Sequence, residues 1–192
     1  IEGCKYVKGH KQVKWIIAFS SIIAALFGYQ VFIVQPSIIS LGFNVKYFGF
    51  LFALIWGFES IVYWNAHRIL KFLGEKKTLF LIAVIHIICF LALSLINTWF
   101  GFIFIIINYF GRGLFYPITN NFIQKHIVTS HRATTLSVEN FVICLVGMIA
   151  TFIFSRLTDL LSIGRVYMVV GLIAIVSTMI LYFTFPVKKI RK

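Results

Sequence analysis

The chain has 192 residues, of which 60% are hydrophobic, 18% are aromatic and only 12% are charged. A soluble domain is about 45–50% apolar and about 25% charged, and it must cover itself with polar surface, so this composition excludes a soluble protein. The net charge of +13 would suit a nucleic-acid-binding protein. However, the basic residues lie in short segments between apolar runs, where they act as topology signals, so no nucleic-acid partner is expected.

Six apolar runs are long enough to cross a bilayer, which takes about 20 residues in a helix. They cover about 15–41, 47–66, 78–97, 99–124, 133–155 and 165–186. Backbone groups in lipid must bond within a helix or a closed barrel, and barrel strands are shorter and strictly alternating. We therefore predict an all-α integral membrane protein with a six-helix bundle at 15–186, a basic segment at 1–14 and a basic tail at 187–192.

The distribution of Lys and Arg predicts the orientation of the spans. Of the 18 basic residues, 14 lie at the termini and in the connections after the second and fourth spans. Only Lys46, Arg156 and Arg165 lie in the opposite connections. The positive-inside rule then places both termini in the cytoplasm, and we expect a multi-pass protein of a bacterial plasma membrane.

Three charged residues lie within the spans: Glu59 in the second, Arg112 in the fourth and Glu139 in the fifth. A charge at the bilayer centre costs at least about 2.5–3.5 kcal/mol, so such residues face a cavity or a partner. Arg112 is about 12 residues, roughly 18 Å, from either end of its predicted span, too deep to reach the interface fully.

The helix around Arg112 carries a polar stripe along one face. At 100° per residue, six polar residues fall within about a third of the circumference: Asn108, Tyr109, Arg112, Tyr116, Thr119 and Asn120. Pro117 predicts a kink in this span. The pattern favours a helix that lines a cavity, and a purely structural ion pair remains the alternative.

Both acids are predicted to lie on the cytoplasmic side of Arg112, offset by about 5–10 Å along the membrane normal. Tyr63 lies one turn beyond Glu59, and Thr135 lies one turn before Glu139. Burial and a nearby arginine act in opposite directions on the proton affinity of a carboxylate. Either acid could therefore carry protons, and either could instead form a structural pair with Arg112.

The first span contributes Gln30 and Gln35, next to Pro36, whereas the third carries only His86 and the sixth carries no charge. This distribution predicts that spans one, two, four and five are interior, and that three and six are peripheral. Gly49, Ala53 and Gly57 form a small-xxx-small ladder, which usually indicates close helix packing.

The sequence gives little support for a disulfide framework, a metal site, a phosphate-binding loop or a catalytic site. The three cysteines form no disulfide framework, and His126 and His131 lack the spacing of a metal site. No phosphate-binding glycine loop is present, so neither a metal nor a cofactor is expected. A membrane-embedded enzyme would need Glu59, His86 or Glu139 as acid or base, and the sequence does not bring catalytic residues together near one membrane face.

The segment 112–137, RGLFYPITNNFIQKHIVTSHRATTLS, resembles the tenth span, following loop and start of the eleventh span of major facilitator superfamily transporters. Arg112, Pro117 and Asn121 match the Arg, Pro and Asn of drug-efflux-like bacterial members. Residues 132–137 match their R-A-T-x-L-S pattern. The resemblance covers essentially the whole chain and implies the C-terminal half of a 12-helix fold, with 1–14 as the remnant of a central loop.

This resemblance implies secondary transport of a small solute by alternating access, with protons as the expected coupling ion and efflux as the expected direction. The expected partners are the lipid bilayer, the solute, protons and a missing N-terminal six-helix half. Ten residues are predicted to line the cavity: Arg112, Glu59, Glu139, Gln30, Gln35, Asn108, Tyr109, Tyr116, Asn120 and Tyr63. A half-size protein that acts as a homodimer or scaffold remains an alternative.

Overall fold

A computed structural model describes residues 9–126 and 129–185, and within these ranges the regular structure is entirely helical. The long helices are α2 (Lys11–Ser40), α3 (Phe48–Leu73), α4 (Glu75–Leu95), α5 (Gly101–His126), α6 (Thr129–Leu160) and α7 (Ile163–Phe183), and the short 3-10 helix η1 (Val45–Tyr47) precedes α3. Six helices of the described ranges are long and apolar enough to cross a membrane. The predicted fold class, an all-helical bundle with six spans, is thus confirmed.

Several helices extend beyond the apolar runs. The clearest case is α3, which continues to Leu73, seven residues past the predicted end of its span. It stops at Gly74, whose φ of +79° is readily adopted by glycine alone. Polar residues do not end a helix when it leaves the apolar layer, so hydropathy underestimated its length. Residues 1–8 of the predicted basic segment and the predicted tail 187–192 lie outside the described residues.

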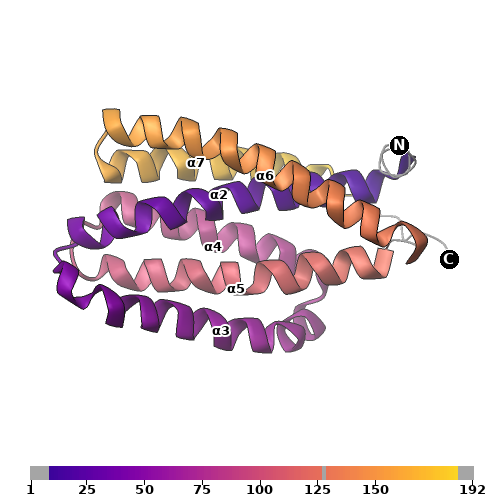
Figure 1. The fold of residues 1–192 in the computed structure, drawn as a ribbon, viewed down its shortest axis with the longest axis horizontal. Coiled ribbons are helices and arrows are strands. Elements are labelled where there is room, and N and C mark those ends of the chain that lie inside the picture. Colours follow the sequence, from indigo (N-terminus) through magenta and orange to yellow (C-terminus); the bar gives the residue numbers. More distant parts are fainter. Residues whose placement is uncertain (1–8, 127–128, 186–192) are drawn as a thin grey trace.

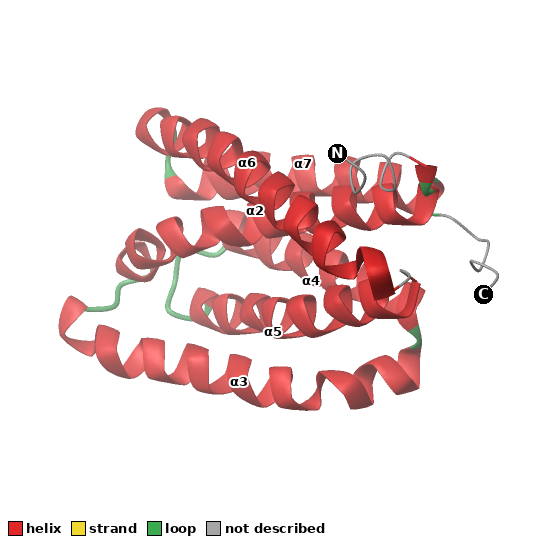
Figure 2. Ribbon diagram, turned by 45° about the vertical axis from the view of Figure 1, so that its right-hand side comes forward, coloured by secondary structure: helices red, strands yellow, loops and turns green. Residues whose placement is uncertain are grey.

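The six helices form a bundle in which α2 and α5 are central (Figure 1). The flanking helices are α6, which packs against α2, and α3, which packs against α5. Behind them α4 packs against both α5 and α7. Figure 2 presents the same order after a 45° turn, with α3 along one side of the molecule and α6 along the other.

Burial within the described chain does not follow the predicted division into interior and peripheral spans, which concerned a cavity shared with a second half. In the most apolar window of each helix, 67% of the residues of α2 and 56% of those of α5 are buried, but only 17% in α3 and 6% in α6. The values for α4 and α7, which were predicted to be peripheral, are 44% and 39%. The reason is that α3 and α6 each pack mainly against one neighbouring helix, so most of their circumference has no contact within the described chain.

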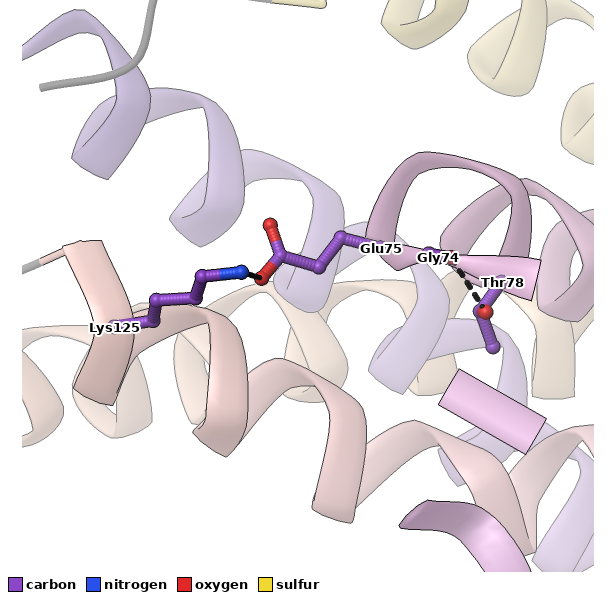
Figure 3. A network of polar contacts seen from close by, with 4 residues as sticks. All are labelled: Gly74, Glu75, Thr78 and Lys125. Atoms are coloured by element: carbon purple, nitrogen blue, oxygen red, sulfur yellow. Dashed lines mark hydrogen bonds and ion pairs between the residues drawn. The ribbon is translucent and has the colours of Figure 1, made fainter. Parts of the chain in front are cut away.

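One end of the bundle gathers most of the basic residues, and we call it the basic end. In the described ranges it carries Lys11, Lys14, Arg68, Lys71, Lys76, Lys77, Lys125 and Arg132. Lys125 near the end of α5 forms an ion pair of 2.7 Å with Glu75 at the start of α4, and Thr78 donates a hydrogen bond to the Gly74 carbonyl group (Figure 3). The sequence-based grouping of these connections on one side therefore agrees with the arrangement of the helices.

An aromatic cluster joins the helix ends at this basic end. The Trp15 indole Nε1 of α2 donates a buried hydrogen bond of 3.0 Å to the Leu181 carbonyl oxygen of α7. The same indole ring stacks on Phe19 and meets Phe185 edge to face. Such aromatic pairs add about 0.5–1.5 kcal/mol each beyond their buried area. The start of α2 and the end of α7 are thus held side by side.

Candidate functional site

An ion pair joins Arg112 of α5 to Glu59 of α3 near the middle of both helices. Arg112 Nε lies 3.1 Å from Glu59 Oε1. Both residues are the twelfth of a 26-residue helix. Because α3 and α5 are separated by the single antiparallel helix α4, they run in the same direction, and equal positions lie at equal depth. The predicted offset of Glu59 toward the cytoplasmic side is therefore wrong, since α3 is longer at its C-terminal end than its apolar run.

A glycine next to Arg112 allows the two helices to approach. A Cβ atom at Gly113 would lie 2.8 Å from the Glu59 carbonyl oxygen and 3.1 Å from Val62 Cβ. Ordinary contacts of this kind begin at about 3.4 Å. Only a residue without a side chain therefore fits here at the observed separation, and this close contact brings the carboxylate within reach of the guanidinium group.

The predicted small-xxx-small ladder does not play this role. A Cβ atom at Gly49 or Gly57 would meet nothing within 4 Å, and both glycines are exposed together with Ala53. The ladder faces away from the other described helices, so any close packing there would involve a partner outside the described residues. Glycine spacing indicates a flat helix face but does not say which neighbour meets it.

The ion pair is neither sealed off nor freely solvated. The side chains of Arg112 and Glu59 retain 27% and 19% of their exposure. The Arg112 guanidinium carbon also lies 5.2 Å from the centre of the Tyr109 ring, a distance typical of a cation–π interaction. Tyr109 is buried, so Arg112 is held from two sides while part of its guanidinium group faces open space.

That space is a cleft of about 270 Å³ between α2, α3 and α5. It is lined by Val31, Val34, Gln35, Phe52, Trp56, Tyr109 and Arg112. Relative to the ion pair the cleft extends toward the end of the bundle opposite the basic end. It combines aromatic and aliphatic walls with one cation and one amide, the composition typical of a small-molecule site.

Three of the predicted residues, Gln35, Tyr109 and Arg112, thus line one cleft. Sequence reasoning missed Phe52 and Trp56 because they are apolar. Their positions seven and three residues before Glu59 place them on its face of α3. Both would have been identified by including the apolar residues that share a helix face with each charged residue.

Three other predicted residues lie outside the cleft, toward the basic end. Tyr63 follows Glu59 by one turn on α3, and Tyr116 and Asn120 follow Arg112 by one and two turns on α5. All three are exposed. They extend an open polar strip from the ion pair along the two parallel helices.

Gln30 and Asn108 were also predicted to line the cavity, but neither is among the residues of the cleft. Both are buried in the bundle. Within the described ranges, the side-chain oxygen and nitrogen of each have no hydrogen-bond partner. A buried amide without a hydrogen-bond partner lowers the stability of the fold by about 1–3 kcal/mol, so these two side chains destabilise the bundle.

His86 of α4 is also buried in the bundle. Its Nδ1 lies 3.0 Å from the Ile82 carbonyl oxygen, and its ring meets Phe27 of α2 edge to face. A Cβ atom at Gly111 of α5 would lie 3.1 Å from the His86 ring. His86 therefore fills the junction of α2, α4 and α5, away from the cleft.

Glu139 is not the partner of Arg112. It is buried on α6, the helix that packs against α2. Its position, ten residues into α6, places it roughly 15 Å from the start of that helix at the basic end. The sequence left open which acid meets Arg112, and the structure selects Glu59.

The three groups considered for acid–base catalysis are therefore dispersed: Glu59 pairs with Arg112 on α5, His86 lies on α4 against Ile82, and Glu139 lies on α6, which packs mainly against α2. Among the residues that the structure describes, no three His, Cys, Asp or Glu side chains gather as metal ligands. The arrangement suits binding of a solute against a charged pair and not a chemical reaction.

The family model described as Major Facilitator Superfamily matches residues 3–151, more than three quarters of the chain. No curated protein matches the sequence.

Proposed function

Because this chain belongs to the major facilitator superfamily, we propose that it is the C-terminal six-helix half of a proton-coupled exporter of small amphipathic solutes. Membership in the family makes it a multi-pass protein of a lipid bilayer that functions in transmembrane transport, and not an enzyme. The proposal concerns the finer points: the half, the coupling ion, the direction and the residues involved.

The observation that carries the proposal is the Arg112–Glu59 pair beside an aromatic-walled cleft at mid-depth of two parallel spans. A charged pair is costly at this depth and is typical of substrate or proton pathways. Substrate sites of such transporters lie near the bilayer midplane, between two repeats of the fold. The cleft lies near the middle of α3 and α5, and the exposed face of α3 beside it could meet a second repeat, so the cleft suits a midplane substrate site.

In the proposed mechanism Glu59 carries the proton. When Glu59 binds a proton from one side, it loses its negative charge and its attraction for Arg112. Arg112 is then free to contact the solute in the cleft. When Glu59 releases the proton to the other side, the ion pair forms again and competes with the solute for the guanidinium group. Coupling requires only that the two access states differ in affinity for the proton and for the solute.

The proposed orientation places the basic end in the cytoplasm of a bacterial cell, following the excess of Lys and Arg in the connections of that end. The exposed faces of α3 and α6 would then pack against an N-terminal half. The outward ladder of Gly49, Ala53 and Gly57 would permit close contact with one of its helices. Six further spans encoded upstream of Ile1 are expected; a start codon directly before Ile1 would instead favour a half-size protein.

The coupling is tested in proteoliposomes that contain the complete transporter and trapped amphipathic dyes, cationic ethidium and anionic fluorescein. An imposed proton gradient should accelerate efflux of at least one dye from wild-type vesicles. Glu59→Gln cannot release a proton and should abolish the acceleration. Glu75→Gln, the same change at a glutamate that pairs with Lys125 at the basic end, is the matched control and should retain it.

Several outcomes would refute the proposal. Gradient-driven efflux that persists in both Glu59→Gln and Glu139→Gln would exclude either acid as the proton carrier. A loss in Glu139→Gln alone would move that role to α6. Failure of both dyes in wild-type vesicles would refute the proposed class of solutes.

A further inference from the structure

A second depression, on the outer surface of the bundle, lies between α2 and α7 at the basic end. It has a volume of about 470 Å³. On α2 its wall is formed by Lys11, Lys14, Ala18 and Ile22, which are spaced to follow one face of the helix. It is separate from the Arg112 cleft, with which it shares no residue.

The floor of this groove is apolar and has few hydrogen-bond donors that are not already bonded within the protein. The Trp15 indole N–H is already bonded to the Leu181 carbonyl oxygen. On α7 the Ser177 and Thr184 hydroxyl groups donate to backbone carbonyl groups of their own helix. The remaining donors that line the groove are the ammonium groups of Lys11 and Lys14, both at its mouth.

These two lysines carry uncompensated positive charge. Both are exposed, and neither forms an ion pair with a described residue. The first turn of α2 also contains no acidic residue that could offset this charge. The mouth of the groove therefore complements a negative charge.

We propose that this groove binds one anionic phospholipid, with the phosphate group at Lys11 and Lys14 and an acyl chain along α2 and α7. The groove spans twelve residues of α2, from Lys11 to Ile22, a rise of roughly 16 Å. This length matches half of the roughly 30 Å hydrocarbon core, the depth of a single leaflet. Basic pockets between helices on the cytoplasmic side are a known setting for acidic headgroups.

The site is distinct from the transport cleft and does not depend on the proposed solute or coupling ion. In the proposed orientation it faces the cytoplasmic leaflet, which carries anionic lipids. A lipid held there would bridge the first and last helices of the described bundle, next to the Trp15–Leu181 hydrogen bond.

The proposal is tested by native mass spectrometry of the complete protein in a nonionic detergent, titrated with phosphatidylglycerol or phosphatidylcholine of identical acyl chains. Each lysine near an anionic headgroup contributes about 1 kcal/mol. The first phosphatidylglycerol should therefore bind about 30-fold more tightly than phosphatidylcholine. The double variant Lys11→Gln/Lys14→Gln should lose this preference.

Two further variants separate the groove from general surface charge. Lys71→Gln/Lys77→Gln removes the same charge from the basic end without changing the groove, and it should keep the preference. Ala18→Phe fills the apolar wall and keeps both lysines, so it should weaken binding of the first lipid at least tenfold.

An equal loss of preference in Lys71→Gln/Lys77→Gln would reduce the effect to overall charge and overturn the proposal. The same holds if Lys11→Gln/Lys14→Gln retains the preference, or if Ala18→Phe binds like the wild type. Displacement of the lipid by water-soluble glycerol phosphate would identify a soluble-phosphate site and would also overturn it.

Discussion

Replacing Gly113 with alanine should push α3 away from α5 and loosen the ion pair between them. The new Cβ atom would lie 2.8 Å from the Glu59 carbonyl oxygen, about 0.6 Å short of the 3.4 Å at which ordinary contacts begin. The obstructing atom belongs to the backbone, so no side-chain rotation can relieve the contact. If α3 moved outward by the full 0.6 Å, the 3.1 Å separation between Arg112 Nε and Glu59 Oε1 would grow to about 3.7 Å, beyond the range of a hydrogen bond.

The expected cost is the difference between two effects. Overpacking a tight contact costs about 1–3 kcal/mol, whereas alanine is favoured over glycine in a helix by up to about 1 kcal/mol. Gly147→Ala is the matched control, because a Cβ atom at that position of α6 would meet nothing within 4 Å. It has the propensity gain without the clash, so it should be more stable than Gly113→Ala by about 1–3 kcal/mol.

The assay is thermal denaturation of the two variants in the same detergent, together with gradient-driven dye efflux from proteoliposomes. A difference of about 2 kcal/mol corresponds to roughly 4–8 °C in Tm for a chain of this size. Efflux should fall in Gly113→Ala and remain at the wild-type rate in Gly147→Ala. Equal Tm values together with equal efflux would refute the argument that this glycine sets the distance between α3 and α5.

Three further predictions concern polar groups inside the bundle. Asn108→Leu removes a buried amide without a described partner, so it should leave the free energy of unfolding unchanged or raise it. Ser37→Ala removes a hydroxyl group bonded to the Tyr167 hydroxyl group at 2.7 Å and should lower it by about 1–2 kcal/mol; an equal loss in both variants would contradict this reasoning. Glu59→Gln and Arg112→Gln should each destabilise the fold, because each leaves one charge without its partner. The double variant replaces both charges with neutral amides, so its loss of stability should be about 1–3 kcal/mol smaller than the sum of the two single losses. Strict additivity in a double-mutant cycle of thermal unfolding would show that the pair contributes no coupling energy.

The membrane-spanning helices could be predicted from the sequence because insertion into a bilayer depends on the composition of about 20 consecutive residues. All six expected spans are present. The ends were less accurate, as α3 illustrates, since a helix continues past the apolar layer until a residue such as Gly74 stops it. The charged residues at mid-span were also visible directly, because a charge in an apolar run stands out from its neighbours.

What the tertiary structure decided is which groups meet. Helical periodicity placed Asn108, Arg112 and Tyr116 on one stripe, yet Asn108 is buried and Tyr116 is exposed. Periodicity defines the relative directions of side chains on one helix, but not how that helix is rotated or which neighbour it packs against. The choice of Glu59 over Glu139 as the partner of Arg112 depended on the packing of α3 against α5 at Gly113. Such contacts join residues more than 50 positions apart, and no local pattern encodes them.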